Sequence, residues 1–314
     1  MHGHAPFVDP FWNAMVPLLR NARLRMTRLL GRSQNCHPAD NRHAAYSSPL
    51  PHIIIGGCGR SGTTLVRLIL DSHSGICCGP ESKLFLPDHS NITELARTFK
   101  LDHSAVNSAY ATSTCRAHFI DQFSEICRTA TGKRRWAEKT PRNILNLDFI
   151  FSAWPQCRFI HVLRDGRDVA CSLRTHPRHR VMDGTFVPLN TWNPIEDCIN
   201  RWRNDIEASR RYWSDPRLHV VRYEDLVLQP QRTIENVIHF LGEDWDDALL
   251  DHSSIQSDFR DPLMFPQSAQ ATQKIATDSI GRWQRDLSSH DRTCFKALAG
   301  DLLIELGYAI DNEW

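Results

Sequence analysis

The sequence predicts an α/β protein in which a P-loop-like parallel sheet is flanked by helices on both faces. Three segments support this prediction, because each reads as a short apolar strand, then a turn, then a helix. They begin at His52, Arg158 and His219. Repeated strand–turn–helix units favour right-handed crossovers, which place helices on both faces of one sheet. The 314 residues are enough for one large α/β domain or two small ones.

The first unit is the most distinctive. Residues 52–57 (HIIIGG) are a β-branched run ending in glycine, which is typical of a buried strand in a parallel sheet. A helix is expected directly after it, over 61–72. The other two units place strands over 158–163 (RFIHVL) and 219–222 (HVVR), and helices from about Gly166 and over about 231–241. We expect the stretch from about 88 to 130 to be a helical insertion that caps the site.

The N-terminal region has a different character. Residues 11–32 mix apolar side chains with five arginines, as a basic amphipathic helix on a membrane surface would. Pro17 and an imperfect helical period favour instead a helix packed on the domain, or an extension that frays. Residues 33–50 are polar and without period, which indicates a linker. We therefore expect a partly disordered extension over 1–50 and a single domain over 51–314.

Bulk composition excludes several classes of protein. Lys and Arg number 37 against 36 Asp and Glu, a net charge of +1 that predicts no nucleic-acid partner. The sequence contains neither an apolar run near the ~18 residues of a membrane span nor a secretory signal. Its ten cysteines form no C-x-x-C pair and no zinc-type spacing. We expect free thiols in a reducing cytoplasm and no metal site.

The loop between the first strand and its helix predicts an anion site. Its sequence, GGCGRSGTTLVR over 56–67, contains four glycines that permit a tight turn with inward-pointing N–H groups. The following helix directs its N-terminus at the same place, and hydroxyl groups add further donors. A nucleoside triphosphatase loop needs a Lys after the last glycine, whereas Thr63 follows Gly62 here. A small phosphate or sulfate is therefore favoured over a metal-bound triphosphate.

Two segments carry a resemblance to a known family. RSGTTL over 60–65 resembles the 5′-phosphosulfate loop of sulfotransferases, which use 3′-phosphoadenosine-5′-phosphosulfate (PAPS). FIHVLRDGRDVACSL over 159–173 resembles their 3′-phosphate segment, and RYEDLV and SIGRW are further similar segments. The resemblance covers about residues 52–287. It implies the sulfotransferase fold, PAPS as donor, 3′,5′-adenosine diphosphate as product and no metal. The donor-binding residues that it implies are Arg60, Ser61, Gly62, Thr63, Thr64, Arg164, Ser172, Tyr223, Lys274 and Ser279.

Within the family, RSGTTLVRLILDSHSGICCGPESKLF is most similar to tyrosylprotein sulfotransferases. This resemblance implies that Glu81 is the general base and that Lys139, in EKTP, stabilises the leaving oxygen beside Arg60. The implied acceptor is a tyrosine among acidic residues of a protein or peptide, with Lys83 and Arg142 as substrate-binding cations. Family members often form homodimers. Pro80 departs from the pattern where an acid is usual, and Lys83 stands where an Arg is usual.

Several alternatives remain open at this stage. Some sulfotransferases use a histidine base, and the candidate histidines are His73, His103, His118 and His161. The acceptor could instead be a carbohydrate or a small-molecule hydroxyl. Two alternatives belong to other functional classes. One is a P-loop kinase or nucleoside triphosphatase, and the other is a phosphate-binding protein with the same fold and no enzymatic activity.

Overall fold

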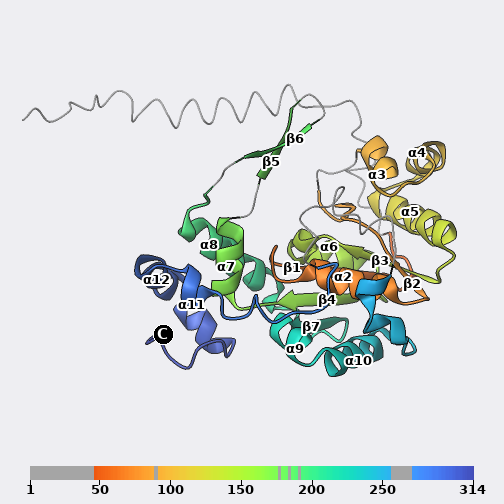
Figure 1. Ribbon diagram of the computed structural model, residues 1–314. Helices are drawn as coiled ribbons and strands as arrows, with labels where there is room; N and C mark the ends of the chain where they lie inside the picture. The colour runs from red at the N-terminus through yellow and green to blue at the C-terminus, as the bar shows by residue number, and fades with distance from the viewer. Residues whose placement is uncertain (1–45, 88–90, 176–177, 183–184, 190–191, 256–270) are drawn as a thin grey trace, which may run out of the picture. The chain divides into compact units, whose positions relative to one another are not determined.

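A sheet of five parallel strands forms the centre of the computed structural model, which describes residues 46–87, 91–175, 178–182, 185–189, 192–255 and 271–314 (Figure 1). The spatial order is β2-β3-β1-β4-β7. The strands are β1 (Ile53–Gly57), β2 (Ile76–Cys78), β3 (Arg135–Lys139), β4 (Arg158–Leu163) and β7 (Leu218–Arg222). A separate antiparallel pair consists of β5 (Arg178–Met182) and β6 (Thr185–Leu189). The predicted α/β class is therefore confirmed.

Helices cover both faces of this sheet (Figure 1). The α-helices are α2 (Thr63–Ser72), α3 (Ile92–Thr98), α4 (His103–Thr112), α5 (Arg116–Thr131), α6 (Leu147–Ala153), α7 (Gly166–Arg174), α8 (Ile195–Arg210), α9 (Tyr223–Leu228), α10 (Pro230–Leu241), α11 (Trp283–Asp286) and α12 (Ser289–Glu305). The 3₁₀ turns are η2 (Pro141–Asn146), η3 (Asp247–Leu249) and η4 (His252–Ser254). The predicted helices after β1, β4 and β7 correspond to α2, α7 and α10.

The strand β1 explains the β-branched run of the sequence, because it is buried on both faces. Ile53 and Ile55 face a core formed with α2 and α10, whereas Ile54 faces a second core with Trp136 and Phe159. Each of the three isoleucines has 0% exposure. Apolar residues in consecutive positions are what a strand with two covered faces requires.

The insertion expected to cap the site is helical, and it packs into the core; that it caps the site stays a prediction. The described residues of α3, α4 and α5 bury their apolar faces in the same core as Trp136. Phe123 of α5 packs edge-on against the Trp136 ring, with centroids 6.2 Å apart. Since this packing covers one face of the sheet beside β3, the insertion is part of the main core.

The boundary of the folded unit also differs from the expected linker over 33–50. Tyr46 donates a hydrogen bond of 2.6 Å to the buried Asp121 carboxylate, and Ser48 N donates one of 2.8 Å to the Ala153 carbonyl. These contacts attach residues 46–50 to the domain. All described residues belong to one compact unit over 44–314. The predicted helix over 11–32 lies outside the described residues.

Two general expectations concern the whole chain. The nine cysteines in the described part of the chain are all free thiols, so no disulfide framework exists there. Among the described residues, no helix combines the length and the apolar character needed to cross a membrane.

Candidate active site

The predicted site residues gather where the parallel strands end. The glycine-rich loop follows β1, Arg164 follows β4, and Tyr223 follows β7. Lys139 is the last residue of β3, and Glu81 lies three residues beyond β2. Because the strands are parallel, their carboxyl ends meet at one edge of the sheet, which is where ligands of open α/β sheets bind.

The glycine-rich loop has the geometry of an anion cradle. Gly62 has φ 97° and occupies the N-cap of α2, where no side chain caps the helix. The first N–H groups of α2 are therefore left for a ligand, at the positive end of the helix dipole. A Cβ at Gly62 would lie 2.4 Å from the Tyr223 ring, so only glycine fits here. The neighbouring Ser61 and Thr63 are buried, and Thr64 is half-buried.

The two predicted phosphate segments meet. Arg60 donates from Nε to Ser172 Oγ at 2.9 Å, and Arg164 donates from Nη1 to the Arg60 carbonyl at 3.1 Å. Arg164 Nε is buried without a hydrogen-bond partner. Burial, followed by the charges of Arg164 and Arg282, lowers the pKa of Arg60. A group of mutually repelling cations with an unpaired buried donor fits a bound polyanion, which would supply the missing charge.

A C-terminal segment crosses this cluster. Arg164 Nη2 donates to the Ser279 carbonyl at 2.5 Å, and the Tyr223 hydroxyl lies 2.6 Å from Ser279 Oγ. Asp168 of α7 fixes the segment by accepting from the backbone of Gly281 at 2.8 Å and of Trp283 at 3.0 Å. No local sequence pattern indicates Asp168, because its partners lie more than 110 residues away in the chain.

Two residues of this segment behave differently from Ser279. Lys274 is exposed, and among the described residues it forms no hydrogen bond or ion pair with the cluster. Trp283 is buried under the guanidinium of Arg167, which lies 4.0 Å from the ring centroid. Trp283 therefore belongs to the core with Trp314, and Tyr223 is the aromatic residue at the site.

The predicted base and cation form an ion pair beside the loop. Lys139 Nζ lies 2.5 Å from Glu81 Oε1 and donates to Thr64 Oγ1 at 3.3 Å. The Lys139 side chain is 4% exposed, whereas that of Glu81 is 39% exposed. Burial alone raises the pKa of Glu81, but the charge and hydrogen bond of Lys139, helped by Lys83 and Arg67, lower it overall. Glu81 is thus an ionised carboxylate at the opening of the site, and Lys139 is the cation inside.

The predicted acceptor-binding cations lie next to this pair. Lys83 is exposed two residues after Glu81, and its backbone N–H donates to Thr140 Oγ1 at 3.2 Å. Arg142 is exposed in η2, just beyond the end of β3. The roles of both side chains in acceptor binding stay predictions.

The alternative histidine bases lie elsewhere. His73 caps the far end of α2 and contacts the Asp244 carbonyl at 3.0 Å, while His103 and His118 bond within the helical insertion. His161 is buried in β4 beside Ser209, and burial lowers its pKa to about 4. None of the four contacts Lys139 or Thr64.

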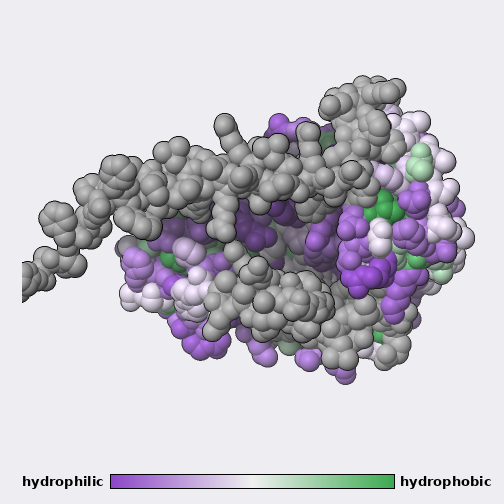
Figure 2. Space-filling model, turned by 90° about the horizontal axis from the view of Figure 1, so that it is seen from above, coloured by the Kyte–Doolittle hydropathy of each residue, from purple (hydrophilic) through white to green (hydrophobic). Residues whose placement is uncertain are grey.

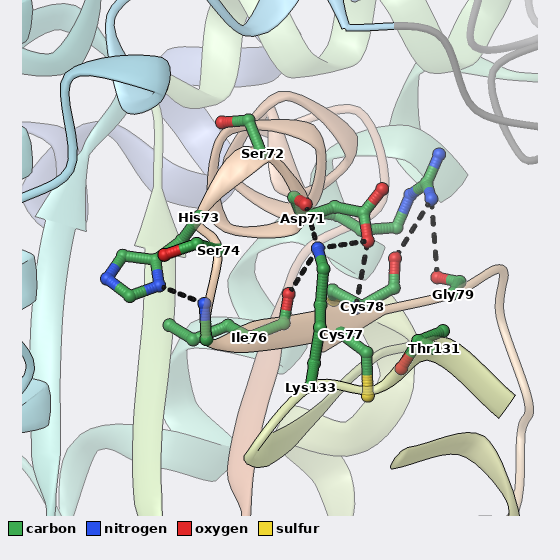
Figure 3. A network of polar contacts seen from close by, with 12 residues as sticks. Asp71, Ser72, His73, Ser74, Ile76, Cys77, Cys78, Gly79, Thr131 and Lys133 are labelled. Carbon is green, nitrogen blue, oxygen red and sulfur yellow. Dashed lines mark hydrogen bonds and ion pairs between the residues drawn. The ribbon is translucent and has the colours of Figure 1, made fainter. Parts of the chain in front are cut away.

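Two buried charged residues that no sequence pattern predicts contact the segment around Glu81. Arg67 of α2 donates to the carbonyls of Cys78 and Gly79, and Glu138 of β3 accepts from Ser82. Figure 3 shows the surroundings of the Cys78 and Gly79 carbonyls. There Lys133 donates hydrogen bonds to the carbonyls of Asp71 and Ile76. From the sequence alone, Arg67 and Glu138 look like ordinary charged residues.

The surface character agrees with a polar ligand. Seen from above, one face of the molecule is hollowed in the middle, and the described residues around the hollow are mainly hydrophilic (Figure 2).

Comparisons with known proteins agree with this geometry. The sequence matches the sulfotransferase family over residues 51–247. Protein-tyrosine sulfotransferase 2 of Gallus gallus is 28% identical over 225 residues, which are 69% of this chain and 58% of that protein. This chain thus spans little more than half the length of that relative. The sulfotransferase domain of the Synechococcus PCC 7002 olefin synthase superimposes with TM-score 0.59 at 22% identity, covering 83% of this chain and 96% of the domain.

A second solved structure shares the fold. The mouse sulfotransferase SULT7A1 complexed with PAP has TM-score 0.53 at 13% identity, covering 84% of this chain and 89% of that protein. The family match extends over more than half of the sequence and includes the phosphate loop, Glu81, Lys139 and Arg164. The chain therefore belongs to the sulfotransferase family.

Proposed function

We propose that this chain transfers a sulfuryl group from PAPS to an acceptor hydroxyl, and that the acceptor is a tyrosine of a protein or peptide. The observation that carries the proposal is the Glu81–Lys139 ion pair beside Thr64 of the phosphate loop. It places a carboxylate and a buried cation at the mouth of an anion cradle. The relatives named protein-tyrosine sulfotransferases support tyrosine as the acceptor.

The residues of the cradle fit the donor. The uncapped N-terminus of α2, with Ser61, Thr63 and Thr64, suits the 5′-phosphosulfate. Arg164, whose Nε is buried without a partner, and Ser172 suit a second phosphate. When bound, PAPS supplies the sulfuryl group as part of its 5′-phosphosulfate. The PAP complex of a mouse protein with this fold is in line with such a ligand.

Side chains of this protein supply both the base and the positive charge that sulfuryl transfer requires. Glu81 is ionised, so it can accept the proton of a hydroxyl placed against it; a phenol has a pKa of about 10 and loses its proton more readily than an alcohol. Lys139 holds a buried positive charge beside Thr64, where it offsets negative charge that gathers on the donor phosphate during transfer. Arg60 adds a second cation at the loop.

The acceptor side has matching charge. Lys83 and Arg142 are exposed cations next to the base, and their charge would attract acidic residues that flank a tyrosine. We therefore expect acidic peptides to be better acceptors than neutral ones, with the difference shrinking as salt screens the exposed charges.

The test is direct transfer from PAPS with a labelled sulfuryl group to an acidic tyrosine peptide. The matched control is the same peptide with Phe in place of Tyr, which should accept no label. Transfer that requires the tyrosine supports the proposal. Transfer only to carbohydrates or small phenols would keep the reaction but contradict the acceptor. Tighter binding of ATP–Mg²⁺ than of 3′,5′-adenosine diphosphate, measured by calorimetry, would contradict the donor and favour a kinase or triphosphatase.

A further inference from the structure

The general base is carried by a segment without regular structure. Residues 79–83 follow β2, lie outside any helix or strand, and include Lys83 at φ 59°. Proton transfer requires the carboxylate to be held close to its ion-pair partner and to the acceptor. A misplacement of about 1 Å can cost on the order of 10²-fold in rate. The groups that fix this segment therefore bear on catalysis.

Arg67 fixes the segment on its upstream side. Its guanidinium Nη1 donates to the carbonyls of Cys78 at 3.2 Å and Gly79 at 3.4 Å, and Arg67 is only 3% exposed. Arg67 belongs to α2, the helix that begins with the phosphate loop. It thereby ties the chain two residues before Glu81 to the element that forms the anion cradle. Figure 3 shows these carbonyl groups beside Asp71, whose carboxylate accepts from Cys78 N at 3.1 Å.

Glu138 fixes the segment on its downstream side. One of its oxygens accepts from Ser82 N at 3.0 Å and from Ser82 Oγ at 2.8 Å, and Glu138 is 1% exposed. The same oxygen accepts from Thr140 Oγ1 at 2.7 Å, and Thr140 Oγ1 accepts in turn from Lys83 N. Ser82 and Lys83 are therefore both hydrogen-bonded to residues at the end of β3.

The position of Glu138 in β3 relates the base to its cation. Adjacent side chains of a strand point to opposite faces, so Glu138 and Lys139 leave β3 in opposite directions. Glu138 holds Ser82 on one side, and Lys139 contacts Glu81 on the other. Asn143 completes the arrangement, since its Nδ2 donates to Glu138 at 2.5 Å and to the Ile55 carbonyl of β1 at 3.2 Å.

We propose that Arg67 and Glu138 are positioning residues, which bracket Glu81 and hold it in line with Lys139 and the phosphate loop. This inference rests on the proposed function for its catalytic meaning. Neither residue touches the reacting atoms; both hold the backbone that carries the base, and the charge of Arg67 also helps to lower the pKa of Glu81. Glu138 binds through both oxygens of a buried carboxylate, one facing Ser82 and Thr140 and the other facing Asn143. In Glu138→Gln the NH2 group accepts no hydrogen bond, so Ser82, Thr140 and Asn143 are left with a single acceptor oxygen.

The experiment compares Glu138→Gln, Arg67→Met and the milder Ser82→Ala with wild type. Asp121→Asn is the matched control, because Asp121 is also a buried carboxylate and accepts from Tyr46 and Trp154, away from Glu81. We expect Glu138→Gln and Arg67→Met to lower kcat by roughly 10²-fold while the Kd for 3′,5′-adenosine diphosphate changes less than about twofold. Ser82→Ala should lower kcat less, and Asp121→Asn should lower Tm without lowering kcat.

The pH profile separates positioning from general destabilisation. When Glu81 drifts from Lys139, its pKa rises, so the acid limb of kcat/KM should move to higher pH in Glu138→Gln but not in Asp121→Asn. The inference would be overturned if both Glu138→Gln and Arg67→Met had the same kcat as wild type and the same acid limb of kcat/KM. An equal loss of kcat in Asp121→Asn would overturn it as well.

A measurement without acceptor keeps this inference separate from the proposed function. Hydrogen exchange of the amides of residues 79–84, in protein saturated with 3′,5′-adenosine diphosphate, reports the order of the segment directly. We expect faster exchange there in Glu138→Gln and wild-type exchange in Asp121→Asn. If the wild-type protein transfers no sulfuryl group, the proposed function is wrong. Faster exchange in Glu138→Gln would even then support the inference that Glu138 holds the segment in place. Unchanged exchange in Glu138→Gln overturns the bracketing whatever the activity.

Discussion

Arg60 of the phosphate loop and Ser172 of α7 are joined by a hydrogen bond of 2.9 Å although 112 residues separate them in the chain. The bond connects the two segments that the family resemblance predicts to bind opposite ends of one nucleotide. Arg164 strengthens the connection through the Arg60 carbonyl. The two predicted anion sites are therefore neighbours, as binding of one bisphosphorylated adenosine requires.

Removing a cation of this cluster should weaken donor binding. Arg60→Met and Arg164→Met each keep a Cβ and most of the side-chain length, so the positive φ of Arg60 is not a new source of strain. Each should reduce the binding free energy of 3′,5′-adenosine diphosphate by on the order of 1.5–3 kcal/mol, the size of a lost charge-assisted hydrogen bond. Calorimetry measures this change. Arg97→Met, which removes an exposed arginine of α3, is the control, and an equal loss there would refute the assignment.

Removing the base should separate binding from turnover. Glu81→Gln retains the shape of the side chain but cannot accept the proton. We expect kcat to fall roughly 10²- to 10⁴-fold, with little change in the Kd of 3′,5′-adenosine diphosphate. Single-turnover transfer and calorimetry on the same preparation check both parts. Lost nucleotide binding would mean that Glu81 has a structural role instead.

Lys139 should govern the acid limb of the pH profile. The ion pair lowers the pKa of Glu81 in spite of burial, so loss of the cation leaves burial to raise it. In Lys139→Met the carboxylate is protonated at higher pH, and activity should start to fall at higher pH than in wild type. The dependence of kcat/KM on pH shows this shift of the acid limb. A limb at the wild-type pH would show that Glu81 is not the titrating base.

Gly62 should tolerate no side chain. Alanine there must adopt φ 97° and bring a Cβ to 2.4 Å from the Tyr223 ring. The backbone conformation alone costs about 1–2 kcal/mol, and the contact displaces Tyr223 from Ser279. Gly62→Ala should lower both Tm and nucleotide affinity. Gly132→Ala also has a positive φ but open space around it, so it should lower Tm only.

His161 should influence stability and not catalysis. Burial lowers its pKa from 6.5 to about 4. Below pH 6.5 His161 therefore binds a proton in the unfolded chain but not in the folded chain. The free energy of unfolding decreases as the pH drops toward 4, by up to roughly 3 kcal/mol. Denaturant unfolding at pH 7 and pH 5 should show a smaller decrease in His161→Gln than in wild type. A loss of kcat in folded His161→Gln would revive the histidine alternative.

The strands predicted from the sequence are those in which consecutive apolar residues indicate burial on both faces. The three isoleucines of β1 and the apolar residues of β4 mark strands that are covered on both faces. Strands β2 and β3 were missed for physical reasons. The first has only three residues, and the second reads RWAEK. In β3, Lys139 and Glu138 contact Glu81 and Ser82, which are 58 and 56 residues away in the chain and which no local pattern shows.

The site shows the same division. Glycines and hydroxyl groups between a strand and a helix predicted the anion loop, because that pattern is local to one strand–turn–helix unit. Arg164 and Ser172 were implied by the family resemblance, and their roles in donor binding stay predictions. Glu138 and Asp168 act on segments 56 and 113 residues away in the chain, and Arg67 acts on carbonyl groups 11 and 12 residues ahead, so only the fold reveals them. Lys274 is exposed, and its role in donor binding stays a prediction.

The most direct measurement is calorimetry of wild type and Arg164→Met with 3′,5′-adenosine diphosphate, 5′-AMP and ATP–Mg²⁺. Wild type should bind the bisphosphate at least about tenfold more tightly than either other nucleotide, which is roughly 1.4 kcal/mol. Arg164→Met should lose that advantage while binding 5′-AMP as wild type does. Equal weakening toward both adenosine phosphates, or tighter binding of ATP–Mg²⁺ by wild type, would contradict one nucleotide held at both ends.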